Sequence, residues 1–132
     1  MDKDKQPGIR FDSIMLVKEE FFRDPNVPEE ATPDFNIGIG WANQDNSYNV
    51  EINTTLKLIY EGKEALKLES TFVGIFSIIE SNENMDMEDF IKHNSAAIMF
   101  PYIREHISSI TQKSGVKPVL LPPINVVALL KN

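Results

Sequence analysis

The strongest constraint on the fold is an alternation of apolar and polar residues through three consecutive segments, residues 35–42, 50–60 and 66–78. The recurring apolar residues are Phe35, Ile37, Ile39 and Trp41 in the first segment, Val50, Ile52, Leu56, Leu58 and Tyr60 in the second, and Leu66, Leu68, Phe72, Phe76 and Ile78 in the third. Such alternation puts apolar side chains on one face of a strand. Short turn-prone stretches separate the segments, so the pattern predicts an antiparallel meander with one packed face.

The N-terminal part of the chain is less regular. Residues 1–8 are polar, and we expect them to be loose. Between residues 9 and 22 the apolar residues occupy both parities, as in a strand that is covered on both faces or contains a bulge. Residues 23–34 contain Pro25, Pro28 and Pro33, which forbid helix and cannot donate to a sheet. This pattern predicts a long exposed connection, and the first two strands need not be neighbours.

From residue 84 onward the pattern becomes helical. Residues 85–92 suit a short acidic helical turn, and Ser95 suits the N-cap of a longer helix that ends near Gly115. The apolar stripe of this helix consists of Ile103, Ile107 and Ile110. Pro101 interrupts the pattern, so either a new helix begins there or a longer helix kinks.

The C-terminal residues complete the expected fold. Residues 116–124 are rich in proline and suit neither a helix nor a central strand, whereas residues 124–130 suit a short closing helix. Strands followed by helices predict the α+β class, with a four-stranded antiparallel sheet and helices packed on one face. A chain of 132 residues suits one domain, which we expect over residues 9–132.

Charge and cysteine content exclude several classes of protein. The formal net charge is −7 without a basic stripe, which disfavours nucleic-acid binding. The chain has no cysteine, which excludes disulfides, cysteine zinc sites and a thiol nucleophile. No apolar run approaches the ~20 residues that cross a bilayer. The N-terminus lacks the apolar core of a signal peptide, so we expect a soluble cytoplasmic protein without membrane insertion.

No group of side chains in the sequence points to an active site. His106 stands close to Ser108 and Ser109, but the G-x-S-x-G motif is missing, which favours a surface histidine beside helix serines. Two histidines without cysteine disfavour a catalytic metal, and the acidic residues 86–89 lack the spacing of a calcium loop. We therefore expect no enzyme activity and no metal.

Three stretches of the chain resemble one known family: GIFSI at residues 74–78, MFPYIREHIS at residues 99–108 and PVLLPPINVVALL at residues 118–130. They resemble the last strand end, the helix motif and the proline-bearing connection of the SecB family of export chaperones. The stretch DPNVPEE is similar to the proline-rich crossover after the first strand of that family. The resemblance extends over residues 17–130, and the FPY-x-RE motif is its most specific part.

The resemblance implies a fold, an assembly and a function. SecB family members are four-stranded antiparallel sheets with two helices, assembled as dimers of dimers. They hold unfolded preproteins or other non-native polypeptides in apolar grooves and carry no nucleotide. Phe100 and Tyr102 would anchor the long helix on the sheet, with Pro101 as an accommodated kink. The chain is therefore expected to be an ATP-independent holdase that forms a homo-tetramer and uses no cofactor.

Apolar residues that prolines keep from regular packing are the expected client-binding groove. These residues are Phe22, Phe35, Leu120, Leu121 and Val126. Apolar contact suits a holdase because it accumulates affinity without demanding a sequence. The alternative, that these side chains only cap the core, stays open. If they form the groove, aspartate at both Phe35 and Leu121 should weaken holding by about tenfold or more without unfolding the chain.

The expected assembly involves the long helix. It carries more apolar residues than one sheet face can cover, so we expect Ile98, Met99 and Ile110 at the interface of the tetramer. A charged residue at Ile110 should then yield dimers.

The resemblance also implies partners. Glu19 and Glu69 match two acidic positions at which the translocase motor SecA docks on the outer face of the sheet in that family. Arg23 stands where a further acid is expected, and the chain ends without the basic tail of export members. Some SecB-like proteins are chaperones of antitoxins, so a dedicated adaptor of one such partner is the alternative function.

Overall fold

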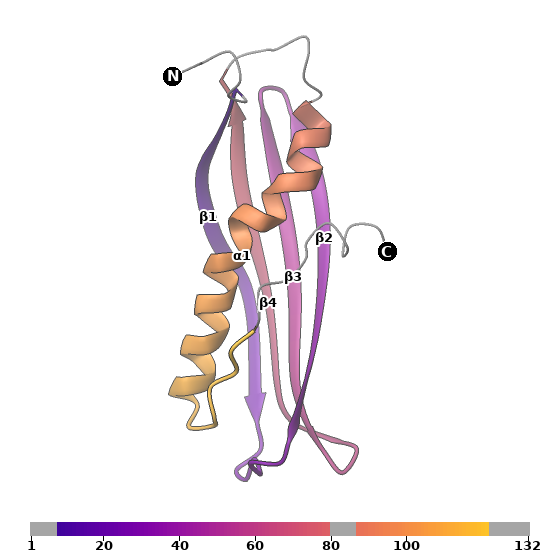
Figure 1. Ribbon diagram of the computed structural model, residues 1–132, viewed down its shortest axis with the longest axis vertical. Coiled ribbons are helices and arrows are strands. Elements are labelled where there is room, and N and C mark those ends of the chain that lie inside the picture. Colours follow the sequence, from indigo (N-terminus) through magenta and orange to yellow (C-terminus); the bar gives the residue numbers. More distant parts are fainter. Residues whose placement is uncertain (1–7, 80–86, 122–132) are drawn as a thin grey trace.

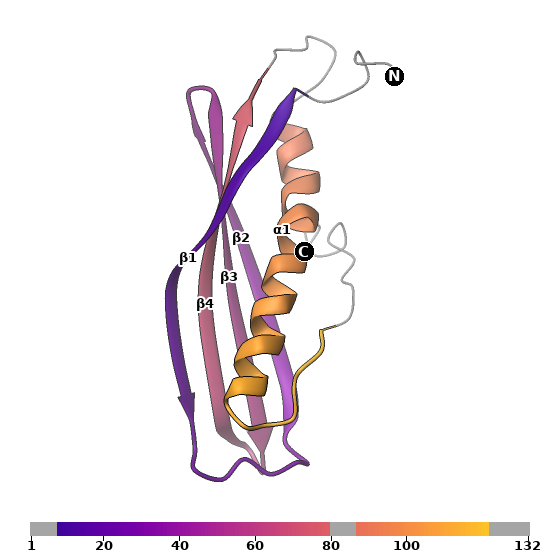
Figure 2. The ribbon, with the colours of Figure 1, turned by 90° about the vertical axis from the view of Figure 1, so that its left-hand side faces the viewer.

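Four long strands and one long helix form the described part of the molecule. The computed structural model describes residues 8–79 and 87–121. The elements are β1 (Ile9–Arg23), β2 (Thr32–Gln44), β3 (Ser47–Tyr60), β4 (Lys63–Ile78) and α1 (Met87–Lys113). The predicted α+β class is confirmed, with one helix on one face of the sheet (Figures 1 and 2). The second expected helix, at residues 124–130, lies outside the described residues.

The strands form an antiparallel sheet in the order β1-β4-β3-β2. The predicted meander of β2, β3 and β4 is confirmed, and β1 and β2 occupy opposite edges. The connection between them covers residues 24–31 and is shorter than expected, because Arg23 ends β1 and Pro33 already pairs with Leu58. Proline is tolerated there because β2 is an edge strand with one free side.

The mixed parity of the first strand has a physical explanation in two bulges. The pairing of β1 with β4 shifts register between Phe11 and Ser13 and again between Leu16 and Lys18. The extra residues at these shifts are Asp12 and Val17. Each bulge inserts one residue and changes which parity faces the helix. The predicted bulge is thus confirmed.

Helix α1 is continuous from Met87 to Lys113, and Pro101 lies inside it. The helix changes direction near its middle in both views (Figures 1 and 2), as expected where proline removes a backbone hydrogen bond. The kinked-helix alternative therefore holds, and no new helix begins at Pro101. The prediction of Ser95 as an N-cap was wrong. Its hydroxyl lies within the helix, is buried and accepts a hydrogen bond from the Trp41 indole at 3.3 Å.

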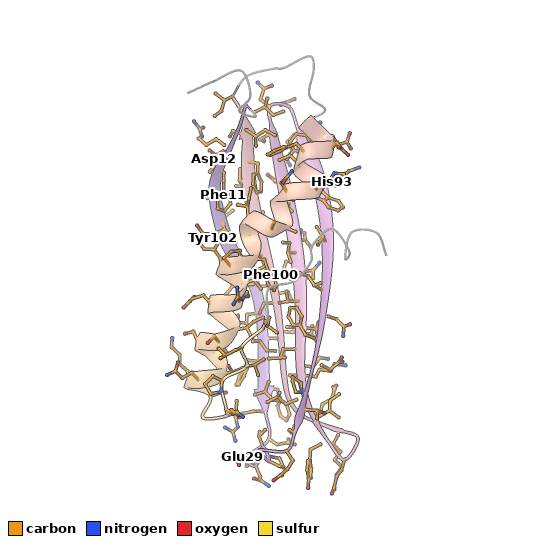
Figure 3. The ribbon with its side chains drawn as sticks, viewed as in Figure 1. Phe11, Asp12, Glu29, His93, Phe100 and Tyr102 are labelled. Carbon is orange, nitrogen blue, oxygen red and sulfur yellow. The ribbon has the colours of Figure 1, made fainter. Side chains whose placement is uncertain are left out.

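Helix α1 crosses one face of the sheet diagonally, from β2 and β3 at its start to β1 at its end (Figure 1). The predicted stripe is buried at Ile103 and Ile107, while Ile110 is partly buried. Halfway along, the Tyr102 ring contacts the Phe11 ring of β1, with centroids 5.9 Å apart (Figure 3).

The core lies between α1 and the inner faces of β3 and β4. Its fully buried residues include Val50, Ile52, Leu56, Leu66, Leu68, Phe76, Ile91, Met99, Ile103 and Ile107. Gly74 brings the helix close to the sheet, because a Cβ atom there would lie 2.6 Å from Met99 Sδ. Within the described residues, no helix is long and apolar enough to cross a membrane.

Candidate functional site

A groove of about 750 Å³ opens at the end of the sheet where α1 ends. One side, which we call the loop wall, consists of Val27, Pro28, Glu29, Ala31 and Pro33. The other side, the connection wall, consists of residues 115–120, and Leu58 of β3 also lines the groove. Glu29 marks this end of the molecule in Figure 3. Two segments about ninety residues apart in the sequence therefore line one cavity.

Both walls exist because their sequences resist regular structure. Val27 is flanked by prolines at 25 and 28, and the connection wall contains Pro118. Proline lacks a backbone N–H, so neither segment can extend α1 or add a central strand. Apolar side chains such as Val27, Val116 and Val119 therefore pack only partly against the core.

Most of the lining side chains are apolar, while backbone groups and the exposed Glu29 and Lys117 side chains on opposite walls add polar surface. Among the described residues, no group of His, Cys, Asp or Glu side chains could hold a metal ion. Irregular backbone with apolar side chains offers contacts to an extended apolar segment, and no described residue supplies an activated nucleophile there.

The fold places the residues that were predicted to line the groove in different parts of the molecule. Leu120 lines the groove and is 78% exposed, whereas its neighbour Leu121 is only 8% exposed and belongs to the core. Phe35 faces α1, pairs with Leu56 and packs against the core next to the loop wall. Aspartate at Leu121 would therefore bury a charge, so the expectation of an intact fold is corrected for that substitution.

Phe22, which was also predicted to line the groove, belongs to neither wall. Phe22 pairs with Lys67, and directly opposite residues share a face, so its side chain lies on the outer face, away from α1. It is 56% exposed there. Val126 lies outside the described residues.

The two predicted docking residues for the motor lie on opposite faces of the sheet. Glu19 pairs with Ser70 on the face that α1 covers. Its carboxylate accepts a hydrogen bond from the Ser70 hydroxyl at 3.3 Å and contacts Nε2 of His106. Glu69 alone lies on the outer face, to which the sequence assigned both residues. The Lys67 ammonium, 2.8 Å away, lowers the pKa of the Glu69 carboxyl by a hydrogen bond and by its charge.

The residues predicted at the tetramer interface are fully or partly buried within one protomer. Met99 is fully buried against Gly74, so it contacts no second copy, and its assignment to the interface is corrected. Ile98 and Ile110 are partly buried and pack against the core. The outward surface of α1 consists instead of exposed residues such as Ala97 and Tyr102.

Sequence reasoning missed Val27 and Pro28 as individual groove residues. Val27 shows the same signal as Leu120, an apolar side chain between prolines, and could have been found by it. No local signal marks the hydrogen bond that Arg23 donates to the Ser114 carbonyl, because the two residues are ninety-one positions apart.

Comparison with known proteins adds the family context. A family model described as preprotein translocase subunit SecB matches residues 3–132. A protein-export protein SecB from Methylococcus capsulatus is 32% identical over 136 residues, covering 97% of this chain and 87% of the relative. One from Chromobacterium violaceum is 31% identical over 131 residues, covering 94% and 86%.

A solved structure shows the same fold. It is a SecB-like chaperone from Mycobacterium tuberculosis in complex with a peptide from an antitoxin, and it superposes with a TM-score of 0.74. The match covers 89% of this chain and 88% of that one at 16% sequence identity. At that identity the likeness establishes the shared fold.

Proposed function

Because this chain belongs to the SecB family, we propose that it is an ATP-independent holdase that binds unfolded preproteins or other non-native polypeptides in the groove between its two walls. The observation that carries this proposal is the groove itself, in which Leu120 is 78% exposed beside partly buried valines. Apolar area contributes roughly 25 cal/mol per Å² without demanding a sequence, which suits many clients. The protein performs no chemical step and needs no cofactor in this role.

The assembly we propose is a homo-tetramer, a dimer of dimers. Eight large apolar side chains are exposed in the described part of the chain, and five of them lie on β1. These five are Met15, Leu16, Val17, Phe21 and Phe22. As an edge strand, β1 also presents unpaired backbone groups. Pairing of β1 with β1 of a second copy would cover the exposed apolar side chains and the unpaired backbone groups of this strand. The outward surface of α1 would then join two such dimers into a tetramer.

The proposal includes a second partner, SecA, at a site separate from the groove. SecA would dock on the outer face at Glu69, whose cross-strand neighbour Glu20 adds a second carboxylate to that face. We place the protein in the cytoplasm, where preproteins are made, and treat residues 9–132 as a single domain.

The alternative function is that of a dedicated adaptor for one partner such as an antitoxin. The structural neighbour from Mycobacterium tuberculosis, which holds a peptide of an antitoxin, favours this alternative. In either function the groove would bind an apolar segment of the partner, so the two differ in the range of segments accepted.

Suppression of aggregation separates the two functions. Several unrelated proteins are diluted from denaturant without ATP, and light scattering is followed at increasing ratios of tetramer to client. We expect suppression of all of them near stoichiometric ratios. Protection of none of them would overturn the general holdase, and protection of only one cognate antitoxin would establish the adaptor.

A further inference from the structure

Arg23 makes hydrogen bonds to the backbone just ahead of each wall of the groove. It is the last residue of β1 and pairs with Leu66, so its side chain lies on the face of the sheet that α1 covers. Its Nε donates to the Asp24 carbonyl at 2.9 Å, and its Nη2 donates to the Pro25 carbonyl at 3.2 Å. Its Nη1 donates to the Ser114 carbonyl, ninety-one residues away.

The three carbonyls mark the points from which the two walls begin. Asp24 and Pro25 are the first residues of the connection that leads into the loop wall. Ser114 follows the end of α1 and directly precedes the connection wall. Carbonyls at a helix C-terminus lack intrahelical donors and carry partial negative charge, so a guanidinium is a favourable partner there.

No other hydrogen bond or salt bridge between described residues joins these two segments. The loop wall is attached to the sheet at both ends: ahead of it the Asp24 N–H donates to the Ala65 carbonyl at 2.8 Å, and its last residue, Pro33, belongs to β2 and pairs with Leu58. The connection wall is fastened to α1 by the Val119 N–H, which donates to the buried Thr111 hydroxyl at 3.0 Å. Each wall is thus fixed on its own side, and Arg23 supplies the polar link across.

We propose that Arg23 is a positioning residue that holds the two walls at a fixed separation and thereby determines the size of side chain that the groove accepts. This inference rests on the proposed function and names what limits the range of clients. An arginine suits the task because its planar guanidinium offers five donors in fixed directions, whereas a lysine ammonium is a point charge on a flexible stem. The residue has no salt bridge to any described carboxylate, so its donors serve backbone carbonyls.

A distance measurement across the groove tests the link directly. The chain has no cysteine, so Glu29→Cys and Lys117→Cys attach spin labels at one exposed site on each wall. Labelled protein is mixed with excess unlabelled protein so that only distances within one protomer are recorded. We expect one narrow distance distribution, which Arg23→Gln broadens at least about twofold and Arg23→Lys broadens less.

The matched control is Arg10→Gln. Arg10 is also on β1, but its Nε donates to Asp12 at 2.5 Å near the other end of the strand. This substitution removes an arginine charge without touching either wall, so it should leave the distance distribution unchanged. Circular dichroism and light scattering establish that each variant keeps its fold and assembly. An unchanged distribution in a folded Arg23→Gln protein overturns the proposal.

The effect on clients is measured with two unstructured decapeptides that differ only in two central residues, tryptophan or valine. We expect Arg23→Gln to change the ratio of the two dissociation constants at least about threefold and Arg23→Lys to restore part of it. A residue with a merely structural role would change stability and leave the ratio as it is, and that result overturns the proposal. If the parent binds neither peptide, the holdase function fails, and the label distances alone decide whether Arg23 links the walls.

Discussion

Gly74 and Met99 show how a single residue determines the distance between α1 and the sheet. A Cβ atom at Gly74 would lie 2.6 Å from Met99 Sδ, which is closer than carbon and sulfur atoms approach. Met99 is fully buried, so it has little free space into which to move. The glycine therefore reflects a close approach of helix and strand, one of two readings that a glycine in a strand allows.

Substitution of this glycine should lower stability. Gly74→Ala forces Met99 and the helix outward, and we expect the free energy of unfolding to fall by about 1–3 kcal/mol. Gly38→Ala is the matched control, because a Cβ there meets nothing within 4 Å. The measurement is urea unfolding at equal protomer concentration, since assembly contributes to stability. Equal stability of the two variants would contradict the close approach.

A second prediction at this scale concerns Asp12, the extra residue of the first bulge. The Ser77 hydroxyl, which donates to its carboxylate, and then the Arg10 side chain lower the pKa of this carboxyl. Ser77→Ala should therefore raise the pKa of Asp12 toward its ordinary value. A carboxyl whose pKa is lowered by folding stabilises the fold above its unfolded pKa, and this contribution disappears as the pH falls through the folded value.

The Asp12 prediction is tested by an NMR titration of the carboxyl carbon. We expect the titration midpoint of Asp12 to be lower in wild type than in Ser77→Ala. Ser13→Ala, at a neighbouring position on β1, is the control and should have the same midpoint as wild type. An identical midpoint in wild type and Ser77→Ala would show that the hydroxyl does not hold the carboxylate.

At the scale of elements, the sequence predicted three of the four strands well because their alternation is uninterrupted. It could not place the side chains of β1, because each of its two bulges reverses the parity that faces α1. Glu19 lies beyond both bulges, where the two reversals cancel, and its assignment to the outer face failed because it rested on the resemblance to the family and not on the alternation. The prediction of Ser95 as an N-cap failed for a different reason. The helix already begins at Met87, and the Ser95 hydroxyl accepts a hydrogen bond from the Trp41 indole.

The groove could be predicted only in outline. Proline-flanked apolar residues indicated both segments, but their meeting depends on where β1 and α1 end in space. Leu120 and Leu121 carry the same local signal, and only the packing assigns one to the groove and the other to the core. The link through Arg23 joins residues ninety-one positions apart, which no local pattern reports.

The proposed assembly predicts two separable interfaces. Val17 on β1 is 54% exposed, and Ala97 lies on the outward surface of α1. A charge buried at either interface without a partner is costly, so Val17→Asp and Ala97→Glu should each give dimers, and the double variant should give monomers. Light scattering at micromolar concentration measures the mass. A tetramer in the double variant would contradict the assembly, and Glu61→Lys at an exposed turn is the control for a change of charge.

At the scale of the whole molecule, the sheet and helix act as a frame that leaves a groove incompletely packed at one end of the sheet. The core between α1, β3 and β4 is closed, whereas the groove of about 750 Å³ stays open between segments that prolines keep irregular. A SecB-type chaperone needs both properties: a stable protomer and apolar surface that the protomer does not cover itself.

The most direct test of the groove is the affinity for a permanently unfolded, fluorescently labelled protein, measured for wild type, Leu120→Asp and Ile79→Asp. Burying one leucine side chain contributes about 1.5–3 kcal/mol, so Leu120→Asp should weaken binding by about tenfold or more with unchanged folding and assembly. Ile79 is also exposed, at 61%, but lies after β4 and lines neither wall, so Ile79→Asp should bind like wild type. Equal affinity of Leu120→Asp and wild type would contradict client binding in this groove.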